Sequence, residues 1–140
     1  MDKLNTSDFA SQHTDKHSKK RKSVINLSPG KKNILLIGPQ SDPNDAERSF
    51  MAPALGVIRL AGYLNQNGHD THHYEPNLVM LTKKGKKIEE ILSEKKWDII
   101  GFSVLEETLI YDIKNMQIAE KLNPHCLMIA GGIEAQFNYQ

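Results

Sequence analysis

The chain has 140 residues, a formal net charge of +1 and a single cysteine, Cys126. The length suits one domain of ordinary size, and the near-neutral charge gives no argument for nucleic acid or an anionic membrane as a partner. One cysteine excludes an intrachain disulfide, so nothing indicates an oxidising compartment and a cytoplasmic location is expected. No apolar run approaches the roughly 20 residues that span a bilayer, so no transmembrane helix is expected.

Residues 1–32 form a polar, lysine-rich segment with few apolar side chains. Such a segment cannot bury enough surface to offset the entropy lost on ordering, so we expect a disordered basic tail. The Lys-Lys-Arg-Lys cluster at 19–22 allows two interpretations, a nuclear or RNA-binding signal and a solvated leader. The solvated leader is favoured because isolated charge runs are usually solvent-facing.

Strands and helices are expected to alternate after this tail. Residues 33–38 are a continuous apolar run, which indicates a strand buried on both faces of a parallel sheet. The loop over 39–53 is longer than the usual connection of about 2–6 residues, so it is expected to be functional or mobile. Apolar residues recur at helical spacing over 54–67, and 70–74 is a polar strand typical of a sheet edge.

The second half continues the alternation after an expected loop over 75–85. Helices are predicted over 88–96 and 108–123, and strands over 98–104 and 126–130. The apolar face predicted for the last helix consists of Ile110, Ile113, Met116, Ala119 and Leu122. The alternation indicates a three-layer α/β/α, flavodoxin-like (Rossmann-like) parallel sheet. The polar second strand belongs at an edge, which gives the strand order 2-1-3-4.

This order places a ligand crevice at the carboxyl ends of the first and third strands. The third strand runs into Ser103-Val104-Leu105-Glu106, and Gly131-Gly132 follows the fourth strand. A serine hydroxyl can donate and accept hydrogen bonds, and adjacent glycines allow positive φ or close approach of the backbone to a bulky group. Taken alone, each motif is more typical of an ordinary turn.

Several motifs nevertheless occur together, in one order, along residues 33–140. They occupy 50–56, 60–64, 68–69, 98–103 and 130–135. In this order they resemble the amino-terminal cobalamin-binding domain of B12-dependent radical S-adenosylmethionine enzymes. The resemblance implies that 33–140 is a cobalamin-binding-like domain. The residues that it assigns to cofactor binding are Ser103, Val104, Leu105, Glu106, Gly131 and Gly132.

Two departures from related B12 proteins narrow what the resemblance implies. Methionine synthase and the mutases carry an Asp-x-His-x-x-Gly motif whose histidine ligates cobalt, whereas the loop over 39–46 contains no histidine. The implied cofactor is therefore base-off cobalamin without a lower histidine ligand, its dimethylbenzimidazole tail lying near Ser103 and Gly132. A Cys-x-x-x-Cys-x-x-Cys site is also absent, since Cys126 is the only cysteine. An iron–sulfur cluster, S-adenosylmethionine and methyl transfer would then belong to a longer parent or to a radical domain in trans, and this chain would supply no catalytic residue.

The family pattern also implies a fifth strand and helix after Gln140, so we expect the amino-terminal part of a longer protein or a truncated product. The alternatives are a stand-alone cobalamin carrier or sensor, and a flavodoxin-like interaction module without catalysis. A response-regulator receiver is excluded because Ser103-Val104-Leu105 stands where its phospho-accepting aspartate would be. Glu106 could contact corrin amides, whereas exposure to solvent is favoured for Glu107 and His69.

Overall fold

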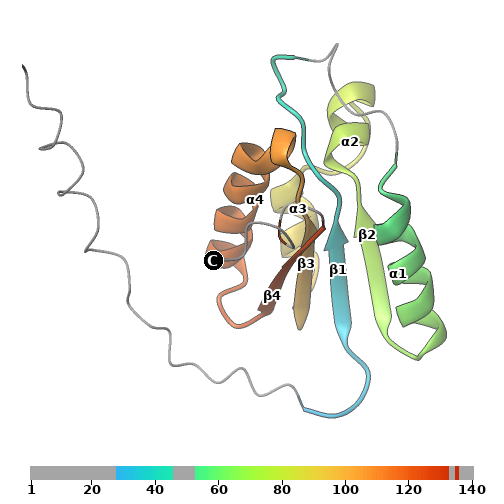
Figure 1. The fold of residues 1–140 in the computed structure, drawn as a ribbon. Helices are drawn as coiled ribbons and strands as arrows, with labels where there is room; N and C mark the ends of the chain where they lie inside the picture. The colour runs from blue at the N-terminus through green and yellow to red at the C-terminus, as the bar shows by residue number, and fades with distance from the viewer. Residues whose placement is uncertain (1–27, 46–52, 133–134, 136–140) are drawn as a thin grey trace, which may run out of the picture.

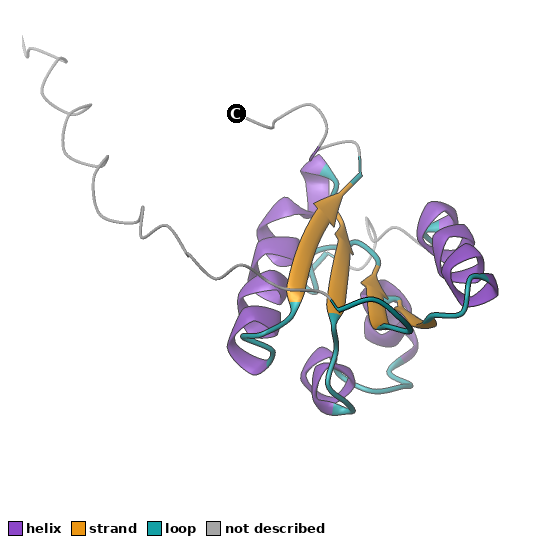
Figure 2. Ribbon diagram, turned by 90° about the horizontal axis from the view of Figure 1, so that it is seen from below, coloured by secondary structure: helices purple, strands orange, loops and turns teal. Residues whose placement is uncertain are grey.

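The protein folds as a four-stranded parallel sheet with helices on both faces (Figures 1 and 2). A computed structural model describes residues 28–45, 53–132 and 135. Most of the expected tail, residues 50–52 of the motif at 50–56 and residues 133–134 of the motif at 130–135 lie outside the described residues. The strand order is β2-β1-β3-β4, which confirms the predicted order and the edge position of the polar strand. The strands are β1 (Asn33–Ile37), β2 (Asp70–Tyr74), β3 (Ile99–Ser103) and β4 (Leu127–Gly131).

The helical segments follow the prediction with two additions, the short helix α2 (Pro76–Thr82) and the 3₁₀ turn η2 (Glu106–Thr108). The other helices are α1 (Leu55–Gln66), α3 (Ile88–Ser93) and α4 (Leu109–Leu122). The expected loop over 75–85 was wrong, because Pro76 begins a short helix and Lys83, with φ 55°, ends it. Within the described ranges, no helix combines the length and apolar composition that a bilayer crossing needs.

A further difference from the prediction concerns the end of α3, which stops at Ser93 rather than continuing to 96. The chain turns there so that Trp97 enters the core, where its side chain is only 2% exposed. Its indole nitrogen donates to the Ile91 carbonyl oxygen at 3.2 Å, which satisfies a carbonyl of the last helical turn. Burial of the indole therefore sets the end of the helix.

Alternate residues of each inner strand face two separate cores. Leu35 of β1 and Ile100 of β3 lie in the larger core, which α3 and α4 cover on one face of the sheet. Ile34 and Leu36 point to the opposite face and pack with Ala61 of α1. Burial of both faces explains why the sequence of β1 is continuously apolar rather than alternating.

Helix α1 covers only part of its face of the sheet, since it packs against β1 and β2. Among the described residues, no helix covers β3 and β4 on that face, and Ile129 of β4 is 48% exposed. The order β2-β1-β3-β4 places this uncovered half beside the exposed flank of α1. The fold thus leaves an apolar recess on one side of the sheet.

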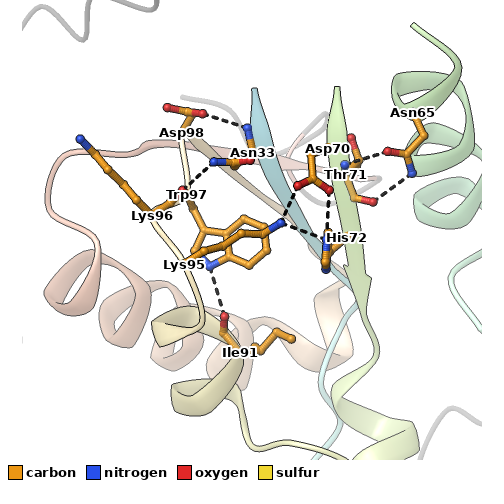
Figure 3. A network of polar contacts seen from close by, with 10 residues as sticks. All are labelled: Asn33, Asn65, Asp70, Thr71, His72, Ile91, Lys95, Lys96, Trp97 and Asp98. Carbon is orange, nitrogen blue, oxygen red and sulfur yellow. Dashed lines mark hydrogen bonds and ion pairs between the residues drawn. The ribbon is translucent and has the colours of Figure 1, made fainter. Parts of the chain in front are cut away.

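A network of hydrogen bonds and an ion pair connects the strands near their amino ends, opposite the carboxyl edge (Figure 3). The Asp98 carboxylate accepts a hydrogen bond from the Asn33 main-chain nitrogen at 2.8 Å. Lys95 donates to Asp70 at 2.8 Å and lies 4.8 Å from the ring centroid of Trp97. His72 meets the same indole edge-on. These contacts hold the edge strand β2 against the entry to β3.

Candidate functional site

The recess between α1 and the uncovered half of the sheet is a groove of about 470 Å³. This volume lies within the roughly 300–1,000 Å³ of small-molecule pockets, and the lining is predominantly apolar, as such pockets are. Its apolar walls are formed by Val57, Leu60 and Leu64 of α1 and by Ile34, Ile99 and Ile129 of the sheet. The groove therefore suits a flat, largely apolar group.

Small residues line the groove toward the carboxyl ends of β3 and β4. Side chains alternate along a strand, so Ile99, Gly101 and Ser103 share the groove face of β3. On β4, Ile129 and Gly131 share the corresponding face. A Cβ atom added at Gly131 would meet no atom of the described residues within 4 Å, so the described chain leaves this side of the groove open. The absence of side chains there leaves the mouth of the groove wide while its inner end is lined with isoleucine.

Gly132 joins the ends of β3 and β4 in a conformation that favours glycine. Its φ is +107°, and a Cβ atom would lie 2.7 Å from the Val104 carbonyl oxygen. The Val104 amide in turn donates to the Gly131 carbonyl at 2.8 Å. Both the positive φ and the close backbone approach therefore require glycine at this position.

The structure separates the predicted cofactor-binding residues into two groups. Ser103, Gly131 and Gly132 come together in the groove. Val104 does not line it, because its side chain points to the opposite face and is 3% exposed in the larger core. Leu105 is half-buried and Glu106 is exposed at the start of η2, beyond the end of β3. The adjacency of Ser103 and Val104 in a strand was enough to predict that they face opposite ways.

The Ser103 hydroxyl is the polar side-chain group of the groove. It is half-buried, and among the described residues it makes no hydrogen bond. A hydroxyl in this position can donate to a ring nitrogen or accept from an N–H group. The groove thus combines a broad apolar surface with one polar group that can orient a ligand.

A buried polar cluster at the carboxyl edge was not predicted from the sequence. The Asp112 carboxylate of α4, 2% exposed, accepts from the Gln40 amide at 2.9 Å and from the Thr108 hydroxyl at 2.6 Å. Asn115 donates to the Gln40 side-chain oxygen at 2.7 Å. Burial raises the pKa of the Asp112 carboxyl, while the hydrogen bonds from Thr108 and from the main chain of Gln40 and Leu105 lower it.

This cluster also corrects part of the apolar face predicted for the last helix, of which Met116 and Ala119 do pack in the larger core. Ile110, Ile113 and Leu122 are exposed at 69%, 43% and 43%, whereas Asp112 and Asn115 point inward. The polar side chains face inward because they hydrogen-bond the loop after β1, and this turns the isoleucines toward solvent. Two polar residues spaced i and i+3 on the predicted helix were the available signal.

The loop after β1 is also tied to α2 and to the end of β2. The Ser41 amide donates to the Asn77 side-chain oxygen at 2.8 Å. The Glu75 carboxylate accepts from the Ala54 amide at 3.0 Å and contacts His73 at 2.8 Å. These bonds hold residues 38–42 and the start of α1, which forms one wall of the groove.

The described part of the chain provides no cluster of three or more His, Cys, Asp or Glu side chains that could hold a metal ion. His69 lies at the amino ends of the strands, where its Nδ1 atom accepts from the Lys32 amide at 3.3 Å. It is therefore remote from the carboxyl edge, and its side chain is half-buried rather than exposed to solvent as expected. Cys126 is buried, and burial raises the pKa of its thiol.

Comparison with protein families identifies this architecture. The family described as "B12 binding domain" matches residues 43–140, which include both α1 and the glycine pair. The chain belongs to the B12 binding domain family. Its four-stranded parallel sheet, in the order 2-1-3-4, is the flavodoxin-like α/β fold expected for that domain.

One curated relative of this B12 binding domain is an enzyme of Rubrivivax gelatinosus, the anaerobic magnesium-protoporphyrin IX monomethyl ester cyclase. The two sequences are 27% identical over 106 residues, which cover 76% of this chain and 19% of the relative. The chain therefore spans about a fifth of the length of that enzyme. No solved structure gives a significant match to this chain.

Proposed function

We propose that this B12 binding domain holds cobalamin with the dimethylbenzimidazole tail in the groove and the corrin across the carboxyl ends of the strands. The observation that carries the proposal is the groove itself, which is apolar along its walls and free of side chains at Gly131 and Gly132. A planar, mostly apolar base needs such a surface, and its ring nitrogen needs one polar partner. Ser103 is the residue proposed to supply that partner.

We infer that cobalamin is bound base-off, without a histidine below the cobalt. The loop that carries this ligand in other B12 proteins has no histidine between Gly38 and Pro53. The described part of that loop is held by main-chain bonds to Asp112 and Asn77. A tail lodged in the groove would be kept away from the cobalt, and the loop over 39–46 would offer no histidine in its place.

The proposed role of the chain is to bind and orient the cofactor, which itself supplies the organometallic chemistry. We infer that it serves a B12-dependent radical S-adenosylmethionine enzyme of the methyl-transfer type, with the radical domain provided in cis or in trans. The order of motifs along 33–140 supports this assignment. The relationship to a longer curated enzyme, of which the chain matches 19%, supports the narrower point that a domain like this one can form part of a larger enzyme.

The test is direct binding by the purified chain. Hydroxocobalamin or methylcobalamin should remain with the protein through gel filtration, and the bound cofactor should show a base-off visible spectrum. If the protein elutes without cobalamin, the proposal is refuted. A base-on spectrum would refute the base-off inference alone.

A matched pair of variants tests the location. Gly131→Leu places a side chain in the groove, where the structure has open space, and should weaken cobalamin binding about ten-fold or more, equivalent to about 1.4 kcal/mol. Gly62→Leu makes the same change on the exposed side of α1 and should leave the affinity within about two-fold. Equal affinities of the two variants would place the tail elsewhere.

A further inference from the structure

The buried Asp112 cluster joins two loops that are remote in the sequence. Gln40 follows β1, whereas Leu105 and Thr108 follow β3. The Asp112 carboxylate accepts from the Gln40 amide through one oxygen and from the Thr108 hydroxyl through the other. The Thr108 hydroxyl also lies 3.3 Å from the Leu105 carbonyl oxygen, and the main chain of Leu105 lowers the pKa of the Asp112 carboxyl. One side chain of α4 therefore sets the distance between the loops on either side of the β1–β3 boundary.

This boundary is the place where the fold receives a ligand. In an open parallel sheet, ligands bind at the carboxyl ends of the strands, where the strand order reverses. Here β1 and β3 are neighbours, with β2 on one side and β4 on the other. The loops that Asp112 joins are those that leave β1 and β3 at this point.

We propose that Asp112 is a positioning residue that fixes the loops after β1 and β3 at the spacing that receives cobalamin. This inference rests on the proposed function. Asp112 does not line the groove and is 2% exposed, so it acts through the loops rather than by touching the cofactor. Asn115 supports it by fixing the Gln40 side chain at 2.7 Å.

The cluster is better explained by positioning than by stability alone. A buried carboxylate carries a desolvation cost that an apolar residue of α4 would avoid. The directional bonds of Asp112 instead define one arrangement of two loops, which an apolar contact would not specify. If loosening lowers the fraction of molecules with both loops in place to a tenth, the apparent dissociation constant rises about ten-fold.

The test uses the full chain and hydroxocobalamin, titrated by visible absorption. Asp112→Ala removes both carboxylate oxygens, which accept from Gln40 and Thr108, and should weaken cobalamin binding about ten-fold or more. Asp112→Asn keeps one oxygen for Gln40 and should show an intermediate loss. Asp98→Asn is the matched control, because Asp98 also accepts from a main-chain amide, at the opposite edge of the sheet. Its affinity should stay within about two-fold of wild type.

A second measurement, without cofactor, separates loop positioning from general destabilisation. Under conditions in which every variant is folded, hydrogen exchange at the Gln40 and Leu105 amides should be faster in Asp112→Ala and Asp112→Asn. Exchange at the Leu127 amide, which donates to the Asp98 carbonyl at the amino ends of the strands, should not change. Unchanged exchange at Gln40 and Leu105, or equal affinities of wild type and Asp112→Ala, would overturn the positioning role. A wild-type chain that fails to bind cobalamin would overturn the proposed function and, with it, this role.

Discussion

Gly132→Ala is predicted to destabilise the protein because position 132 is constrained twice. Its φ of +107° lies in a region that residues with a Cβ rarely adopt, which costs about 1–3 kcal/mol. The new Cβ would also lie 2.7 Å from the Val104 oxygen and 3.1 Å from its nitrogen. Relief of this contact must pull the ends of β3 and β4 apart and weaken the bond from Val104 to Gly131, worth about 0.5–1.5 kcal/mol. The sum is a loss of about 1.5–4.5 kcal/mol in the free energy of unfolding.

Urea denaturation followed by fluorescence measures this loss. Trp97 is the only tryptophan and is 2% exposed, so its emission reports on the core. The denaturation midpoint of Gly132→Ala should fall while the slope of free energy against urea concentration stays unchanged. Gly131→Ala is the neighbouring control: its Cβ meets no atom within 4 Å, and its φ is not positive.

The control should be as stable as wild type, or slightly more so, because alanine reduces the entropy of the unfolded chain by up to about 1 kcal/mol. Equal midpoints for Gly131→Ala and Gly132→Ala would refute the reasoning, since only the second position is strained. A loss of cobalamin binding by Gly132→Ala counts as evidence on the site only where the variant is folded.

Two further predictions concern α1 and α4. Gly62→Ala should raise the free energy of unfolding by up to about 1 kcal/mol in urea denaturation, because Gly62 is in the interior of α1 with open space around its Cβ position. No gain would indicate that the helix needs glycine there. Burial raises the pKa of Asp112 above its ordinary value of 3.8, so the folded state keeps the proton longer than the unfolded state. The contribution of Asp112 to stability should therefore fall as the pH rises above about 3.8, until the raised pKa is passed. Denaturation of wild type and Asp112→Asn at several pH values measures this, and a difference between them that grows with pH in favour of wild type would contradict it.

Local patterns in the sequence were sufficient to predict the strands and most helices. The continuous apolar runs that became β1 and β4 indicated a parallel sheet, and the polar run at Asp70–Tyr74 indicated an edge strand. The positions of Ser103 and of the glycine pair at strand ends also followed from chain order. These features depend on residues close in sequence, whose periodicity is visible without knowledge of the fold.

Helix α2 was not predicted, because it has only seven residues, too few to show a helical period.

The inward direction of the Asp112 side chain was not predicted for a different reason. Asp112 and Asn115 are 72 and 75 residues from their partner Gln40, and no local pattern records such a pairing. Periodicity assigns polar residues to the solvent side, so it correctly grouped Met116 and Ala119 on the packed face but missed that Asp112 points inward.

The sequence by itself determined the parallel sheet, its order and the residues at the ends of β3 and β4, because hydrophobic periodicity and strand-end composition are local properties. Only the tertiary structure decided that α1 leaves half of its sheet face open, that Ser103 and Gly131 share this groove, and that Val104 does not. It alone placed Asp112 between the loops after β1 and β3. These features depend on how separate elements pack, since a groove and a buried hydrogen-bond cluster exist only between segments that folding brings together.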